Sequence, residues 1–157
     1  MIPRVADAFL GGLLDLLAET FEGPQQEWSW YLDQDRNTGL FATLNALTAA
    51  QASRHTPLGP SVAGQAAHLH FHLAATLRAL RGEAAALDFA RSWEGQEVTE
   101  AEWLERRAGL HDTYEALRAF TLAHDRWDPD EATGLLAALT HAAYHLSAIR
   151  QSVKLLW

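Results

Sequence analysis

The chain has 157 residues, of which 48% are hydrophobic and 20% are charged, a balance typical of folded proteins that argues against an intrinsically disordered chain. Cysteine is absent, so neither a disulfide nor a thiolate metal site can form. The formal net charge of −8 opposes contact with phosphate backbones and argues against nucleic-acid binding.

The first 21 residues, MIPRVADAFLGGLLDLLAETF, carry apolar residues at helical spacing, interrupted by Asp7, Asp15 and Glu19. They predict an amphipathic helix from about Pro3 to Phe21. The segment is too charged for the core of a signal peptide, and its apolar run is too short to span a membrane. We therefore expect a cytoplasmic protein with no membrane partner.

A turn-rich stretch follows, QQEWSWYLDQDRNTG at residues 25–39. Its three large aromatic side chains, Trp28, Trp30 and Tyr31, allow two interpretations. They either cover a pocket at the end of a helical bundle or bury the connection between the first two helices.

The second predicted helix runs from about Gly39 to Ser53, with Asn37 or Thr38 as its cap. Two prolines and one glycine in RHTPLGPS, residues 54–61, then break the chain.

The third predicted helix starts after Pro60, runs to about Leu80 and is closed by Gly82. A long connection, GEAAALDFARSWEGQEV, separates it from the next helix.

The fourth predicted helix covers residues 100–124, and Thr99 followed by Glu102 is a capping-box pattern at its start. Pro129, with acidic neighbours, opens the last helix, which continues to about Leu155.

The third and last predicted helices share one apolar pattern, in which buried positions step by three and four residues, as in helices that pack nearly parallel to their neighbours. The two sets are Val62, Ala66, Leu69, Leu73, Thr76 and Leu80 on the third helix, and Leu135, Leu139, Ala142, Leu146, Ile149, Val153 and Leu156 on the last. They predict an all-α fold: an up-and-down four-helix bundle with an additional short helix or long connections, in a single domain over residues 1–157.

The chain has eight histidines, and four of them lie on second lines that run beside these apolar sets. On the last helix the line is Gly134, Ala138, His141, His145, Ala148 and Ser152, and on the third helix it is Gln65, His68, His72, Ala75 and Ala79. The histidines thus sit among small residues, where a neighbouring helix leaves room. If the two lines face each other, three or four imidazoles converge, as in the metal sites of helical bundles.

The alternative is that each pair is only a solvated or hydrogen-bonded pair of helix residues. His70 points roughly 200° away from His68 by helical geometry and is not expected to join the group. The other three, His55, His111 and His124, show no convergence and are interpreted as surface or loop residues.

Other side chains near the histidines have two interpretations each. Gln65 and Tyr144 are possible substrate contacts or partners of the ligating imidazoles, or else a helix-surface amide and a packing residue. Arg78 and Arg150 either meet an anionic substrate or form solvated ion pairs. Ala142 stands where a zinc protease of the HExxH type has its glutamate, which excludes that activity.

The segments SVAGQAAHLHFHL and THAAYHLSAIRQ, in this order, resemble those of the DinB/YfiT-like superfamily of four-helix-bundle proteins. Supporting segments are GLFATLNALTAAQAS, RALRGE and EAEWLERRAGLHDTYEAL, so the resemblance spans nearly the whole chain. Its more specific part is a mid-chain histidine followed by HxxxH near the end.

The resemblance implies one divalent metal ion, zinc or nickel, held by His68, His141 and His145. His72 is an oddity of this chain and is a possible fourth ligand, hydrogen-bond partner of a ligand or proton carrier. It further implies a homodimer, a small-molecule substrate, and for some relatives a transferase or isomerase activity with a low-molecular-weight thiol. The family name refers to damage-inducible expression, a stress response, and implies no DNA binding. Many relatives have a glycine and a glutamine shortly after the final histidine, where this chain has Ser147 and Ala148.

Three imidazoles leave a divalent metal with an open coordination position, which is the arrangement of catalytic sites. Such a position deprotonates a bound water or a bound thiol. The sequence therefore leaves three functions open: a thiol-dependent transferase, which the resemblance favours, a metal-dependent hydrolase, and a non-catalytic bundle that binds a small ligand.

Overall fold

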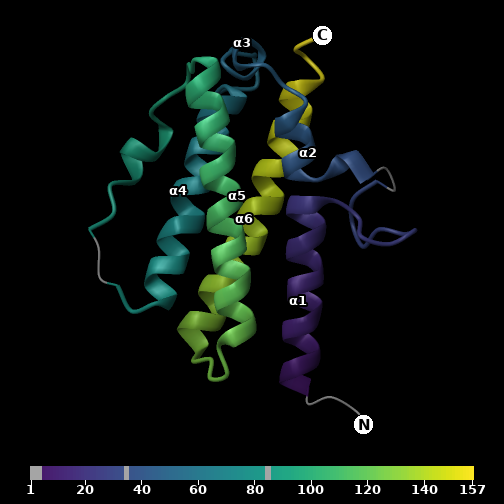
Figure 1. Cartoon of the computed structure of the whole chain (residues 1–157), viewed down its shortest axis with the longest axis vertical. Helices are drawn as coiled ribbons and strands as arrows, with labels where there is room; N and C mark the ends of the chain where they lie inside the picture. The colour runs from purple at the N-terminus through teal and green to yellow at the C-terminus, as the bar shows by residue number, and fades with distance from the viewer. Residues whose placement is uncertain (1–4, 34–35, 84–85) are drawn as a thin grey trace.

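Helices form most of the part of the chain that the computed structural model describes, which comprises residues 5–33, 36–83 and 86–157 (Figure 1). In chain order they are α1 (Val5–Glu22), the 3-10 helix η1 (Arg36–Thr38), α2 (Leu40–Asn45), α3 (Ala49–Ala52), α4 (Val62–Leu80), the 3-10 helix η2 (Phe89–Trp93), α5 (Glu100–Ala123) and α6 (Pro129–Val153). Within these ranges the only β feature is an isolated bridge between Thr56 and Gly59. The all-α expectation is therefore confirmed. None of the described helices is both long enough and apolar enough to cross a membrane.

Helices α5 and α6 begin where the capping residues predict. The Thr99 side chain accepts a hydrogen bond from the backbone N–H of Glu102, whose carboxylate accepts one from the backbone N–H of Thr99. Asp128 and Glu131 form the same reciprocal pair at the start of α6, with Pro129 in its first turn. Because each capping box satisfies backbone donors that a helix leaves free, both starts are fixed locally.

Helix α4 also has local signals at both ends. The Ser61 hydroxyl accepts from the backbone N–H of Gly64 at 3.0 Å, and Gly82 follows the last turn with a φ of +72°, which only glycine adopts at little cost. The predicted apolar positions of this helix are buried, except for the half-buried Thr76. On α6 the predicted positions from Leu135 to Ile149 are buried, Val153 is half-buried, and Leu156 beyond the helix is buried.

The expected up-and-down order of the helices is wrong for α4 and α5, which run in the same direction. Arg106 and Thr113 on α5 contact Ala63 and His70 on α4, and each pair is 43 residues apart in the chain. Such a constant offset is the register of parallel helices. The connection between α4 and α5 therefore returns along the outside of the helices to the end at which α4 began (Figure 1).

Helix α6 runs antiparallel to α4. His68 contacts His145, whereas His72, one turn later on α4, contacts His141, one turn earlier on α6. This register brings the two histidine-bearing faces together. Figure 1 shows α4, α5 and α6 side by side, with α1 next to α6 on the opposite side from α4.

The second predicted helix, from Gly39 to Ser53, is in fact two short helices with a break at residues 46–48. The Nε1–H of Trp103 donates to the backbone oxygen of Leu47 at 2.9 Å, which gives that oxygen a partner outside any helix. Thr48 then caps α3 through a capping box with Gln51. The cap of α2 is Gly39 rather than Asn37 or Thr38. The predicted start of the first helix at Pro3 lies outside the described residues.

The start of α2 lies against the end of α1, because Gly39, the cap of α2, packs directly on the backbone of Gly23. A Cβ on Gly39 would lie 2.2 Å from the backbone nitrogen of Gly23. The two backbones approach so closely that no side chain fits between them. Phe21, Phe41 and Tyr114 pack their rings at this junction, with centroids 4.7–5.5 Å apart.

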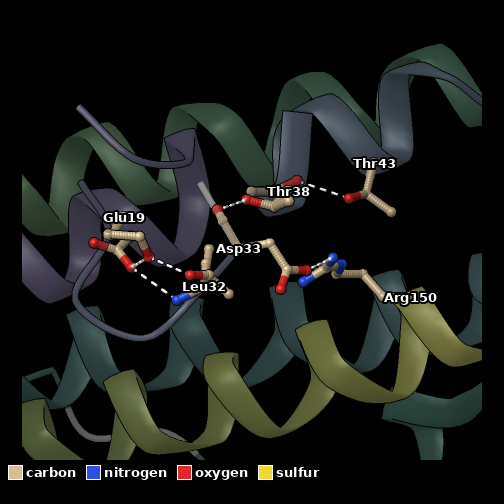
Figure 2. Close-up of polar contacts among 8 residues, drawn as sticks. Glu19, Leu32, Asp33, Thr38, Thr43 and Arg150 are labelled. Carbon is tan, nitrogen blue, oxygen red and sulfur yellow. Dashed lines mark hydrogen bonds and ion pairs between the residues drawn. The ribbon is translucent and has the colours of Figure 1, made fainter. Parts of the chain in front are cut away.

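The aromatic stretch after α1 is held by two charged groups (Figure 2). The Glu19 carboxylate, which is only 4% exposed, accepts from the Ser29 hydroxyl and from the backbone N–H groups of Trp30, Tyr31 and Leu32 at 2.6–3.0 Å. Farther along, the Asp33 carboxylate pairs with Arg150 of α6 at 2.6 Å. These contacts fix the connection between α1 and α2 against α1 and α6.

Candidate functional site

The structure brings together three of the histidines that the sequence singled out. His68 on α4 and His141 and His145 on α6 each offer a ring nitrogen, and these three atoms lie within 4.8 Å of one another. The Nε2 atoms of His141 and His145 are 3.0 Å apart. His68 and His145 are buried, and His141 is half-buried. We call these three residues the histidine cluster.

His72 lies beside the cluster. Its ring centroid is 4.2 Å from that of His141 and 4.5 Å from that of His68. It is not one of the three residues whose nitrogens come within 4.8 Å of one another. The His72 ring also packs against Phe89, at 5.2 Å between centroids.

The connection between α4 and α5 covers His68 through η2. The Nδ1 atom of His68 is 2.7 Å from the hydroxyl oxygen of Ser92, which is itself buried. The indole of Trp93 stacks on the His68 ring, with centroids 3.7 Å apart and planes 13° apart. Trp93 also contacts His145, at 5.9 Å between centroids. One short helix thus touches a residue of each helix that bears the cluster.

The contact with Ser92 fixes the tautomer of His68. The Ser92 hydroxyl donates its one proton to the backbone oxygen of Phe89 at 2.5 Å. It therefore has to accept from His68, so the proton of the neutral imidazole is on Nδ1. The lone pair is then on Nε2, which is the nitrogen left to bind a metal ion.

A second set of hydrogen bonds holds η2 in place. The Gln96 side chain donates to the backbone oxygen of Trp93 at 2.9 Å, and the Ser61 hydroxyl donates to the backbone oxygen of Gln96 at 2.6 Å. Arg106 of α5 donates to the backbone oxygen of Gly95 at 2.7 Å. These bonds tie η2 to the start of α4 and to α5, so Ser92 and Trp93 have fixed positions over His68.

Burial keeps the clustered imidazoles neutral. It lowers the pKa of His68, with a further contribution from the nearby charge of His72. It lowers the pKa of His141 to about 4, as do His72 and His68. It also lowers the pKa of His145 to about 4, together with His141, His68 and His72. Neutral imidazoles have a free lone pair, which is the form that binds metals.

The donor set fits a metal ion. Two nitrogens bound to one tetrahedral zinc ion lie about 3.3 Å apart, close to the separation of the Nε2 atoms on α6. The Nδ1 atom of His145 is buried and has no hydrogen-bond partner among the described residues. The His145 ring is therefore positioned by packing and by its Nε2 contact with His141, whereas a serine hydroxyl holds the Nδ1 atom of His68.

Gln65 is not the helix-surface amide, and Tyr144 is not the packing residue, that their simplest interpretations expected. Gln65 is 4% exposed, so it is not a surface amide, and its side chain donates to the backbone oxygen of Pro60 at 3.4 Å. Tyr144 is 70% exposed, so it is not a packing residue, and its ring meets the ring of His145 edge-on at 5.1 Å.

The four remaining histidines lie apart from the cluster. His70 points toward α5, as expected, where its Nε2 is 2.9 Å from the Thr113 hydroxyl. His55 and His111 are exposed. His124 follows the end of α5, and its Nε2 is 3.3 Å from the Glu131 carboxylate.

The two arginines that were considered as substrate contacts form ion pairs instead. Arg78 pairs with Glu83 at 3.4 Å, and both side chains are about half exposed. Arg150 pairs with Asp33. Burial of the connection does not describe the three large side chains of the aromatic stretch, because Trp28, Trp30 and Tyr31 are 43–59% exposed. Trp30 instead lines an apolar groove between α1 and α6, while Glu19 and Arg150 anchor the stretch.

Ser92 and Trp93 are the residues of this site that sequence reasoning missed. One signal for them is present: the connection RSWEG places a large aromatic residue in a polar, glycine-containing segment. Exposed connections seldom carry tryptophan, so it marks a segment that packs on something. The pattern does not reveal that the packing partner is His68, because the connection has no helical or strand period.

The fold and the site together define a class: an all-helical protein with a cluster of three histidines that could hold a metal ion. No family model matches the chain, and neither a characterised protein nor a solved structure matches it.

Proposed function

We propose that this protein binds one divalent transition metal ion, zinc or nickel, through His68, His141 and His145, and that it belongs to the DinB/YfiT-like superfamily that its sequence resembles. The observation that carries the proposal is the convergence of three neutral imidazoles from two antiparallel helices to within 4.8 Å. Imidazole is a good ligand for zinc and nickel, and no carboxylate belongs to the cluster.

A divalent ion with three imidazole ligands keeps its full charge and an open position, at which water or a thiol loses its proton near neutral pH. The protein positions the ligands for this. Ser92 holds the proton of His68 on Nδ1 and so directs Nε2 inward. Trp93 covers the His68 ring and keeps water from its face.

We further propose that the protein is an enzyme, a transferase that uses a low-molecular-weight thiol and acts on a small molecule. The resemblance supports this choice. A metal-dependent hydrolase is the second candidate, because the open position of the same site would bind water as readily as a thiol. The glutamine of many relatives is replaced here by Ser147 and Ala148, which favours the non-catalytic ligand-binding bundle.

The metal proposal is tested by measuring the metal content of protein purified without an affinity tag, followed by calorimetric titration with zinc and nickel. We expect one ion per chain and a rise in the melting temperature on metal addition. His141→Ala should abolish both, whereas His55→Ala, which changes an exposed histidine outside the cluster, should alter neither. Absence of stoichiometric metal together with an unchanged melting temperature would overturn the proposal.

The two activities are separated by their need for a thiol. Turnover of an activated ester by the metal-loaded protein without thiol, rising with pH, indicates the hydrolase. Strict dependence on an added thiol indicates the transferase. Metal binding without turnover in either assay indicates the non-catalytic ligand-binding bundle.

A further inference from the structure

A groove of about 540 Å³ lies between the second half of α4 and the first turns of α6, beside the histidine cluster. Its lining includes His72, Leu80, Phe89, Asp128, Asp130 and Glu131. Its volume is within the range of sites that bind small organic molecules.

His72 forms the boundary between the groove and the cluster. It lines the groove, and its ring packs against His68 and His141 at 4.5 and 4.2 Å between centroids. A molecule in the groove that touches His72 is therefore one imidazole ring away from two of the three proposed metal ligands.

One wall of the groove is apolar and belongs to the connection between α4 and α5. Leu87 and Phe89 line it, and both side chains are more than a third exposed. Phe89 is also held in place by ring contacts with His72 and Phe71, at 5.2 and 5.6 Å. This wall offers apolar surface that an organic ligand would remove from water.

The part of the groove formed by the start of α6 carries negative charge. Apart from His72, every ionisable side chain among its described lining residues is a carboxylate: Asp128, Asp130 and Glu131. The Asp128 and Glu131 carboxylates accept backbone hydrogen bonds of the α6 capping box, and Glu131 also faces His124 at 3.3 Å. Asp130 has no side-chain partner among the described residues, so its charge is free to meet a ligand.

We propose that this groove binds the organic substrate of the metal centre, and that this substrate has an apolar body and a cationic amine. The inference rests on the proposed function, because it is the metal centre that would act on the substrate. Charge complementarity carries it: the amine meets the carboxylates at the start of α6, and the apolar body lies on Leu87 and Phe89. A thiol that bears a carboxylate would face like charges here, so the groove holds the other reactant.

The test compares three probes that share a phenyl ring on a three-carbon chain and end in a cationic, a neutral or an anionic group: 3-phenylpropylamine, 3-phenylpropanol and 3-phenylpropionate. Each is titrated at low ionic strength into the metal-free protein, so that no probe can coordinate a metal, and binding is followed by calorimetry and amide chemical shifts. We expect the amine to bind about tenfold more tightly than the alcohol, the propionate to bind most weakly, and the shifts to centre on Ala79, Phe89 and Gly134. Equal affinities, or shifts centred elsewhere, overturn the proposal.

The variant Asp130→Asn removes one charge without touching the capping box. It should weaken amine binding about threefold to tenfold and leave alcohol binding unchanged. Asp112→Asn, the same change at an exposed position on α5, is the matched control and should have no effect. Identical amine affinities for the two variants contradict the assignment.

Zinc titration of the same wild-type sample keeps the two proposals apart. Zinc binding without amine preference overturns the groove assignment alone. Amine preference without zinc binding overturns the metal centre, and with it the role of the bound amine as its substrate.

Discussion

The Nδ1 atom of His68 lies 2.7 Å from the hydroxyl oxygen of Ser92, and this contact decides which nitrogen of the imidazole can bind a metal. The donor at one end and the acceptor at the other are both buried. A hydrogen bond to the second nitrogen of a ligating histidine fixes the orientation and tautomer of its ring. Ser92 is thus a positioning residue for the proposed metal centre.

Ser92→Ala should weaken zinc binding about 10-fold to 100-fold, because the Nδ1–H of His68 loses its acceptor in a buried place. A competition titration against a chelating dye measures the change. Ser92→Thr, which keeps a hydroxyl, should restore most of the affinity, and Ser147→Ala, at an exposed serine on α6, should leave it unaltered. Wild-type affinity in Ser92→Ala would show that the serine does not position the ligand.

Trp93 should report metal binding by its fluorescence. Its ring stacks on His68 with centroids 3.7 Å apart, so nickel at the cluster would lie next to the indole and quench its emission. Trp93→Phe should remove most of the quenching while zinc and nickel still bind. Trp157→Phe, which changes an indole that is 81% exposed, should retain it. Full quenching in Trp93→Phe would place the nickel near another tryptophan.

Glu19→Gln should lower the free energy of unfolding by about 2–3 kcal/mol, because an amide cannot accept all the hydrogen bonds that the carboxylate accepts. Urea unfolding near neutral pH measures this effect. Gln25→Ala, in the same stretch, is the control and should change stability by less than about 1 kcal/mol, because it loses a single neutral hydrogen bond to the backbone oxygen of Gly23.

The contribution of Glu19 should also depend on pH. Burial alone would raise its pKa, but the hydrogen bonds from Ser29, Trp30, Tyr31 and Leu32 outweigh burial and hold the pKa below the ordinary 4.5. A carboxyl with a lowered pKa in the folded state stabilises fully above its unfolded pKa, and the stabilisation is lost as the pH falls through the folded pKa. The stability difference between wild type and Glu19→Gln should therefore shrink below about pH 4.5. A constant difference down to pH 3 would contradict this account.

Gly39→Ala should destabilise the protein by about 2–3 kcal/mol, because the new methyl group would overlap the backbone of Gly23. Thermal or urea unfolding measures the loss. Gly11→Ala, in the middle of α1, is the matched control: nothing lies within 4 Å of its added Cβ, and a helical alanine should raise stability by about 0.5–1 kcal/mol. Equal effects of the two substitutions would mean that the junction of α1 and α2 relaxes freely.

The long helices could be predicted from the sequence because their signals are local. Asp128, Pro129 and Glu131 fix the start of α6 whatever packs against it. The break between α2 and α3 could not be predicted in this way. Alanine and leucine favour continuing the helix, and the competing contact comes from Trp103, 56 residues farther along the chain.

The direction of α5 relative to α4 could not be predicted from its apolar pattern either, because an apolar face is buried equally well in parallel and antiparallel packing. The histidine cluster was accessible in part. The four-residue spacing on α4 and α6 identified four candidate histidines, since each helix alone places its pair on one face. The resemblance, and not the spacing, separated His72 from the three residues of the cluster. The cover over His68 comes from η2, whose sequence has no period from which its packing could be deduced.

The parallel course of α4 and α5 places a lower limit on the length of the chain between them. This segment has to travel back along α4, whose 19 residues span about 28 Å at 1.5 Å per residue. The short turn between α5 and α6 has no such distance to cover. Deletions should therefore be tolerated far less well between residues 81 and 99 than insertions of the same size. A shortened segment would pull Ser92 and Trp93 off His68 before it unfolded any long helix.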